Sequence, residues 1–119
     1  MKYITFAIPC YNSESYMRHA IETILTAKDD VEILVIDDGS SDNTLKIAKE
    51  YEVKYPGIVK AIHKENGGHG SGVNKGLSLA KGLYYKVVDS DDWVNEEALK
   101  KVLETIKKLE KEKNLVDMM

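Results

Sequence analysis

Aliphatic residues lead directly into clustered carboxylates at two places in the sequence. These places are VIDDGSSDNT, residues 35–44, and VVDSDDWV, residues 87–94. Carboxylates that crowd one site raise one another's pKa and destabilise the fold unless a cation neutralises them. A hard divalent ion such as Mg2+ or Mn2+ prefers oxygen ligands, and it commonly binds one or two carboxylates together with substrate phosphates. If the two stretches meet, we expect a metal ion that bridges to a diphosphate. Up to five carboxylates would then share one site, namely Asp37, Asp38, Asp89, Asp91 and Asp92.

Some of these aspartates also have a purely structural interpretation. Asp38, Asp42 and Asp92 could cap turns and helix starts, where aspartate is common. The Asp89–Asp91 pair fits that interpretation less well, because two valines lead straight into it and a tryptophan follows. An Asp-x-Asp turn after a strand directs two carboxylates to the same side. One of them could ligate a metal while the other accepts hydrogen bonds from ligand hydroxyls.

The rest of the sequence predicts the elements that hold these stretches. Compact aliphatic runs indicate strands at 3–8, 31–37, 58–63 and 83–89. Apolar residues at i, i+3, i+4 spacing predict helices that begin near Ser13, near Ser41 or Asp42, after the glycine-rich segment 66–72, and near Asn95. This alternation predicts an α/β fold with three α/β/α layers, in which helices cover both faces of an open, mostly parallel, Rossmann-like sheet.

The unusual polar clusters all follow predicted strands. They are PCYN, DDGSSD, ENGGHGSG and DSDD, in chain order. Because ligands of open parallel sheets bind beyond the carboxyl ends of the strands, we expect these four loops to meet at one edge of the sheet. Tyr11, directly after the first strand, is well placed there to stack on a nucleobase. The glycines could bring backbone N–H groups close to phosphate.

Composition limits the class of protein. The chain has 119 residues, 43% of them hydrophobic, and a formal net charge of −3, which describes one ordinary globular domain without the basic surface that nucleic acid requires. No apolar run approaches the roughly 20 residues of a transmembrane helix. Cys10 is the only cysteine, so an internal disulfide is impossible, and no base stands beside it in the sequence to make it a nucleophile. We expect a cytoplasmic location.

Four motifs in this order resemble those of the family 2 glycosyltransferases, which have the GT-A nucleotide-sugar-binding fold. The motifs are IPCYNSE, VIDDGSSDNT, ENGGHGSGVNKGLSLAKG and VVDSDDWV. The resemblance implies transfer of a sugar from a nucleoside diphosphate donor, with UDP the expected nucleotide, Mn2+ or Mg2+ as cofactor, and inversion at the sugar carbon. By position, it places Pro9 and Tyr11 around the nucleobase and Asp38 in a hydrogen bond with it. It places Asp89 on the ribose and Asp91 on the metal ion.

The sequence departs from that family in two respects. Val73 stands where many relatives carry an arginine, so a phosphate contact is missing or comes from Lys64, Lys75 or another segment. Family members are also usually much longer, and their second half carries the acceptor contacts and an acidic catalytic base. We therefore expect residues 1–119 to be a single donor-binding domain, the N-terminal part of a longer enzyme, with the base beyond residue 119 and little activity alone.

Several alternatives and partners stay open at this point. A nucleotidylyltransferase-type nucleotide-sugar enzyme would share the fold, although PCYNSES lacks the lysine or arginine that a triphosphate-binding loop needs. A non-catalytic interaction domain would keep the fold without the donor. The full-length enzyme could lie at the inner face of the membrane, and an exposed sheet edge could pair with a second copy. The donor sugar and the acceptor, whether glycan or lipid, are not specified by these motifs.

Overall fold

The four predicted strands form one parallel sheet, as expected. The computed structural model describes residues 2–117, apart from the side chains of His69 and of residues 113–117. The elements are β1 (Ile4–Cys10), α1 (Met17–Leu25), the short 3-10 helix η1 (Lys28–Asp30), β2 (Val31–Asp38), α2 (Thr44–Lys54), β3 (Val59–Lys64), α3 (His69–Leu79), β4 (Tyr84–Val87) and α4 (Glu96–Asp117). The strand order is β3-β2-β1-β4, and each neighbouring pair is parallel.

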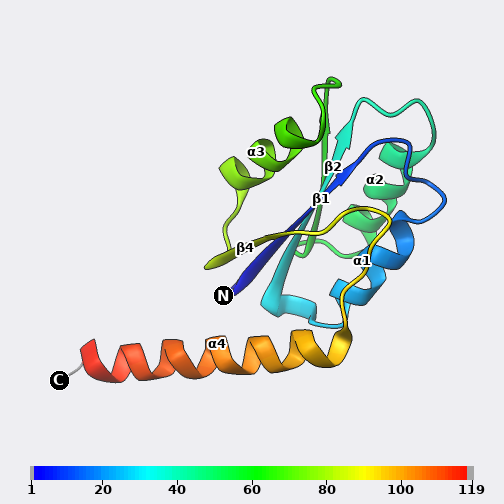
Figure 1. Ribbon diagram of the computed structural model, residues 1–119. Helices are drawn as coiled ribbons and strands as arrows, with labels where there is room; N and C mark the ends of the chain where they lie inside the picture. The colour runs from blue at the N-terminus through cyan, green and yellow to red at the C-terminus, as the bar shows by residue number, and fades with distance from the viewer. Residues whose placement is uncertain (1, 118–119) are drawn as a thin grey trace.

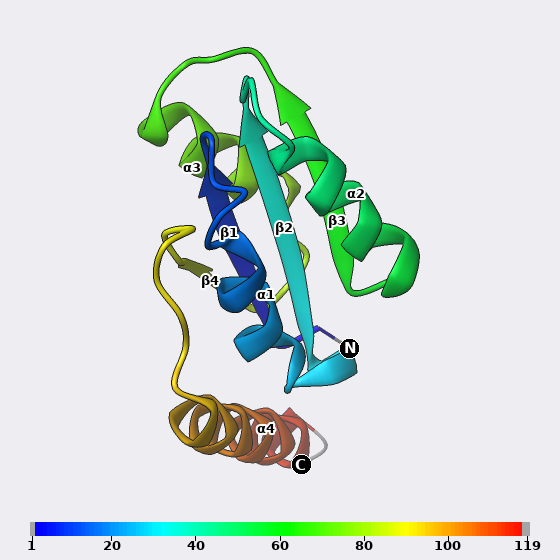
Figure 2. The same cartoon turned by 90° about the vertical axis from the view of Figure 1, so that its right-hand side faces the viewer.

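Helices cover both faces of the sheet, which confirms the predicted three layers (Figure 1). Figure 2 shows α1 and α2 in front of the sheet and α3 behind it. α4 lies under the end of the sheet at which β1 begins, away from the loops that follow the strands (Figure 1). β1 and β2 are almost wholly buried because they are covered on both sides, as their aliphatic composition predicted.

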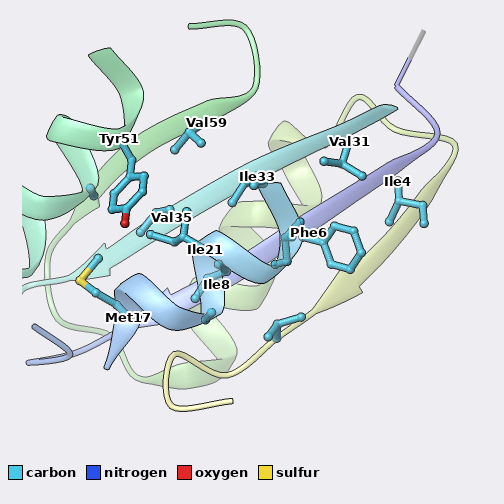
Figure 3. Packing of buried hydrophobic residues seen from close by; sticks show 14 of the residues in the cluster. Ile4, Phe6, Ile8, Met17, Ile21, Val31, Ile33, Val35, Tyr51 and Val59 are labelled. Carbon is cyan, nitrogen blue, oxygen red and sulfur yellow. The ribbon is translucent and has the colours of Figure 1, made fainter. Parts of the chain in front are cut away.

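The larger core lies between the sheet and the layer of α1, α2 and α4. Figure 3 shows Met17 and Ile21 of α1 packed against strand residues such as Ile8 and Val35. Tyr51 of α2 closes the cluster beside β3 (Figure 3). A smaller cluster on the opposite face, beneath α3, consists of Ala7, Leu34 and Ile36, with Ile62 and Tyr85 packed against it.

A buried polar group fastens the start of β4 to the centre of the sheet. Glu32 Oε1 accepts hydrogen bonds from Thr5 Oγ1 at 2.9 Å and from the Lys81 N–H at 3.0 Å. Thr5 Oγ1 in turn accepts the Gly82 N–H at 2.8 Å. Lys60 Nζ lies 3.5 Å from the other oxygen of Glu32. These partners offset the cost of burying a carboxylate and hold β4 alongside β1.

Three local predictions need correction. β1 continues through Pro9 to Cys10, because a parallel partner is available in β2. α1 begins at Met17, and it is the carbonyl of Ser13, not its side chain, that accepts the Met17 N–H. α3 begins inside the segment that was expected to be a loop, so that several of its glycines are helical.

Two further points concern helices. Of the apolar residues predicted on one face of α4, Leu99, Leu103 and Ile106 are buried, but Val102 and Leu109 are exposed. Within residues 2–117, no helix is both long and apolar enough to cross a bilayer.

The glycines of α3 let this helix lie close against the sheet. A Cβ on Gly76 would be 2.6 Å from Tyr85 Oη, 2.9 Å from Ile36 Cδ1 and 3.0 Å from Ala7 Cβ. Two of these neighbours are fully buried and cannot move aside freely. At Gly70, one turn and a half earlier in the same helix, a Cβ would meet no atom within 4 Å.

We predict opposite effects for the two glycines. Gly76→Ala should lower the free energy of unfolding by about 1–3 kcal/mol because of overpacking. Gly70→Ala, the matched control, should be neutral or stabilising by up to about 1 kcal/mol because alanine favours helix. Urea unfolding followed by circular dichroism measures both. Equal stability of the two variants would show that α3 does not sit against the sheet as described.

Candidate functional site

The loops that follow β1 and β2 are joined by hydrogen bonds at the carboxyl edge of the sheet. The Asn12 N–H donates to Ser40 Oγ at 2.9 Å, and the Ser41 N–H donates to Asn12 Oδ1 at 2.9 Å. The Ser13 N–H donates to Thr44 Oγ1 at 2.8 Å. Asn12 has a φ of 49°, a left-handed conformation that asparagine tolerates better than most residues. These contacts hold the segment after β1 in one position.

The loop after β4 reaches the same segment. Ser90 Oγ lies 2.7 Å from Ser13 Oγ, and the Val94 N–H donates to Thr23 Oγ1 of α1 at 3.1 Å. The strand order reverses between β1 and β4, because α1 and α3 leave on opposite faces of the sheet. Open parallel sheets bind ligands at that switch point. We call this edge of the sheet, where residues 11–13 after β1 meet the loop after β4, the crevice.

Pro9 and Tyr11, the residues expected to surround a nucleobase, lie at the carboxyl end of β1. The side chain of Tyr11 is 53% exposed, which leaves its ring accessible to a ligand. Pro9 is half-buried, and α3 packs against it, since a Cβ on Gly72 would lie 3.3 Å from Pro9 Cβ. The two residues therefore offer a rigid apolar floor and an exposed aromatic ring.

Asp38 accepts hydrogen bonds from three donors, one on Lys64, the last residue of β3, and two in the segment that follows it. It is 5% exposed, and its Oδ1 accepts Lys64 Nζ at 2.6 Å and the Gly67 N–H at 2.9 Å. Its Oδ2 accepts the Gly68 N–H at 2.9 Å. Burial alone would raise the pKa of Asp38, but the hydrogen bonds from Lys64, Gly67 and Gly68 outweigh it and lower the pKa below its usual value.

Asp37 is also satisfied within the protein. It is 1% exposed, its Oδ1 accepts the Ser40 N–H at 3.0 Å, and its Oδ2 lies 2.8 Å from His63 Nδ1. Among the described residues, no group of three or more His, Cys, Asp or Glu side chains is arranged to hold a metal ion. The prediction that five carboxylates share one site is therefore wrong. Asp37 is hydrogen-bonded to His63 and the Ser40 N–H, and Asp38 is paired with Lys64 and two backbone N–H groups.

The residues 89–92, which we call the acidic turn, present their carboxylates outward. The Asp92 N–H donates to the Asp89 carbonyl at 2.9 Å, which closes a tight turn, and Asp92 Oδ1 accepts the Trp93 N–H at 2.8 Å. Asp89, Asp91 and Asp92 are all exposed. All three carboxylates are therefore accessible to solvent on the turn that follows Val88.

Two other candidates have structural roles. Asp42 accepts the Thr44 N–H at 2.9 Å and the Glu14 N–H at 3.2 Å, which confirms the capping interpretation. Cys10 is buried, and this burial, with Asp37 nearby, raises the pKa of its thiol to about 12. A thiol with so high a pKa is a poor nucleophile at neutral pH, in agreement with the sequence analysis.

Some contributors were not identified from the sequence. Lys64 was considered as a phosphate ligand, but its Nζ is bound to Asp38 and to the Glu65 carbonyl. The pairing of Asp38 with Lys64 follows from the β2–β3 register, which no local pattern specifies. Ser13 and Ser90 meet across the crevice although the chain separates them widely. The local sequence around Ser90, a serine between two aspartates, does not indicate its contact with Ser13.

The sequence and the fold both match known glycosyltransferases. A profile of Glycosyl transferase family 2 matches residues 5–116. Over 105 residues the chain is 35% identical to glycosyltransferase GlyG of Streptococcus pneumoniae, covering 87% of this chain and 35% of GlyG. Over 100 residues it is 38% identical to the poly(ribitol-phosphate) beta-glucosyltransferase of Bacillus spizizenii, covering 81% of this chain and 16% of that protein.

Solved structures agree. S. aureus TarS (1-349) in complex with UDP-GlcNAc matches with a TM-score of 0.79 and 34% identity, over 91% of this chain and 32% of that one. The mannosyltransferase PcManGT from Pyrobaculum calidifontis matches with a TM-score of 0.72 over 81% of this chain and 30% of that one, and its 22% identity shows the fold alone. The predicted GT-A fold is confirmed. The chain spans about a third or less of the length of these proteins.

We predict that Asp38 contributes stability that depends on pH. Its folded-state pKa is lowered, so its contribution is present above the unfolded-state pKa and is lost as the pH falls below about 4. Asp38→Asn should lower the free energy of unfolding at pH 7 by about 1–3 kcal/mol, because the amide N–H2 faces existing donors. Asp29→Asn, at an exposed position in η1, is the control.

Urea unfolding at pH 7 and at pH 3 measures this effect. The difference between wild type and Asp38→Asn should shrink at the lower pH, because the unfolded-state carboxylate, whose pKa is the higher of the two, takes up a proton and favours unfolding of the wild type. A difference that stays constant across this range would contradict the assignment of an ionised Asp38 to the three donors.

Proposed function

The chain belongs to glycosyl transferase family 2, and on that premise we propose that residues 1–119 bind the nucleoside diphosphate sugar that donates the sugar. The observation that carries the proposal is the crevice at the switch point, with the exposed ring of Tyr11 on one side and the acidic turn on the other. UDP is the nucleotide we propose, since TarS, at 34% identity, is known in complex with UDP-GlcNAc. The family match favours this function over the nucleotidylyltransferase alternative.

The nucleobase would lie between Tyr11, Pro9 and Asp38. Stacking on an exposed tyrosine suits any base, because every base has a flat aromatic face. Selection of uracil would come from Asp38, whose fixed, ionised carboxylate can accept a base N–H. Its Oδ2 accepts the Gly68 N–H, and a carboxylate oxygen has two acceptor sites, so a second donor can be added without displacing the first.

The acidic turn suits the ribose and a hard metal ion. We propose that Asp89 accepts hydrogen bonds from the ribose hydroxyls and that Asp91 ligates Mn2+ or Mg2+. Fewer than three protein ligands is the arrangement expected when substrate phosphates complete the coordination of such an ion. When bound, the ion would supply Lewis-acid stabilisation of the departing diphosphate. Asp91 thereby holds the ion, while Tyr11 and Asp38 orient the donor.

The acceptor site and the catalytic base are proposed to come from outside residues 1–119. The relatives that match are about three times as long or longer, which supports this division of work. Val73 stands at the position where many relatives carry a phosphate-binding arginine. Lys64 does not supply this contact, because its Nζ is bound to Asp38. Lys75, in contrast, is exposed on α3. The cytoplasmic location and the pairing of a sheet edge with a second copy stay predictions.

We predict that Tyr11 carries much of the affinity for the nucleobase. Tyr11→Ala should weaken UDP binding by about 1–3 kcal/mol, roughly 5- to 150-fold in Kd, because the stacking surface is lost. Tyr16→Ala removes a similarly exposed tyrosine outside the crevice and should leave the Kd unchanged. Isothermal titration calorimetry with UDP and Mn2+ gives both values. No binding of UDP to the wild-type chain would favour the non-catalytic interaction domain.

We predict that Asp91 provides the metal dependence. In the wild-type chain, Mn2+ should strengthen UDP binding, and in Asp91→Asn it should change the Kd by no more than about twofold, because the neutral amide is a weak metal ligand. Glu97→Gln, at an exposed acidic position in the first turn of α4, should keep the wild-type response. The ratio of the Kd values in EDTA and in Mn2+ measures the effect, and an unaltered ratio in Asp91→Asn would exclude Asp91 as the ligand.

A further inference from the structure

The hydroxyl of Ser13 is the meeting point of three groups at the crevice. The side chain is 1% exposed, and its Oγ accepts the Tyr11 N–H at 3.2 Å and lies 3.3 Å from the Tyr11 carbonyl, to which it can donate. It also lies 2.7 Å from Ser90 Oγ, where either hydroxyl can be the donor. Ser13 therefore touches both the backbone of the proposed base-stacking residue and the middle of the acidic turn.

A capping function does not account for this hydroxyl. α1 begins at Met17, and the Met17 N–H is accepted by the carbonyl of Ser13, so the side chain is not needed to start the helix. The position of Ser13 is fixed independently, because its N–H donates to Thr44 Oγ1, which belongs to the start of α2. A serine hydroxyl held in this way is a fixed attachment point for Ser90.

Ser90 stands between the two carboxylates that are proposed to contact the donor. The acidic turn is closed by the bond from the Asp92 N–H to the Asp89 carbonyl, so Ser90 and Asp91 move with Asp89 as one turn. Further along, the loop is attached to α1 through the Val94 N–H. The Ser90 hydroxyl thus contacts the segment that carries Tyr11.

We propose that Ser13 and Ser90 are positioning residues whose hydrogen bond fixes the acidic turn relative to Tyr11. This inference rests on the proposed function and adds to it. The base-binding and diphosphate-binding ends of the site are then set at one spacing before the donor arrives. Pre-organisation of this kind strengthens binding, because the cost of ordering the loop is not paid on association.

Ligand-free protein offers the first test, because Trp93 is the only tryptophan and follows the acidic turn directly. Its ring contacts His19 edge-on, with centroids 5.2 Å apart. Time-resolved fluorescence anisotropy of Trp93 reports the mobility of this loop. Ser90→Thr and Ser90→Val have the same shape and differ in the hydroxyl alone. We expect a larger amplitude of fast depolarisation in Ser90→Val than in Ser90→Thr. Ser13→Ala, which also loses the contacts with the Tyr11 backbone, should show an amplitude at least as large as that of Ser90→Val.

Ser15→Ala is the control for the segment after β1, because Ser15 is exposed two residues from Ser13. It should leave the anisotropy decay of wild type unchanged. Equal decays in Ser90→Thr and Ser90→Val, whether both resemble wild type or both are altered, would overturn the proposal. Circular dichroism and thermal unfolding of each variant exclude a general loss of structure as the cause.

Titration with UDP supplies the second test. Ser90→Val should weaken UDP binding in Mn2+ about fivefold relative to Ser90→Thr, the factor that one hydrogen bond is worth, and change it less than about twofold in EDTA. The double variant Ser13→Ala/Ser90→Val should bind no more weakly than Ser13→Ala alone, because Ser13→Ala already removes the bond to Ser90. Additive losses would overturn the proposal.

The two tests separate this inference from the proposed function. If wild-type chain fails to bind UDP, the proposed function is wrong, and the coupling to donor binding falls with it. If wild type binds UDP with Mn2+ but the threonine and valine variants agree in both tests, donor binding stands and the positioning role of Ser13 and Ser90 is wrong.

Discussion

Parallel pairing of β1 with both β2 and β4 is the constraint on which the rest of the molecule depends. In parallel strands all carboxyl ends lie at the same edge, so four polar segments separated in the chain are brought to one place. Burial of β1 and β2 on both faces supplies the free energy that holds this arrangement. The buried Glu32, which accepts Thr5 Oγ1 and the Lys81 N–H, extends the same order to the short edge strand.

The paired aspartates after β2 organise the edge of the sheet. Each is buried, and each is satisfied by donors from other segments: Asp37 by Ser40 and the neighbouring His63, and Asp38 by Lys64 and the N–H groups that follow it. A buried carboxylate without hydrogen-bond donors would destabilise the fold, so the loops that supply these donors are held against Asp37 and Asp38. The two aspartates therefore position two loops. The role proposed for Asp38 in base recognition depends on a carboxylate that its hydrogen-bond donors already hold in place.

The crossing of α3 to the opposite face creates the crevice. With α1 on one side and α3 on the other, the ends of β1 and β4 have no helix between them, and the segment after β1 faces the acidic turn. Gly72 and Gly76 allow α3 to approach Pro9 and the sheet closely. The topology thus places Tyr11 on one loop of the proposed site and the Asp89–Asp91 pair on another. The contact of Ser13 with Ser90 links these two loops.

Sequence alone determined the class of fold, the order of the elements and the family. Aliphatic strands alternating with amphipathic helices restrict the topology to a few forms, and motifs such as VVDSDDWV are short and local, so they can be read without a structure. Tertiary structure alone decided which carboxylates are buried against partners and which are exposed. Asp37, Asp38, Asp89 and Asp91 have the same chemistry in the sequence, but strand register buries the first two against partners from β3 and leaves the other two exposed. Register and burial depend on contacts between residues far apart in the chain, and no local pattern of residues encodes them.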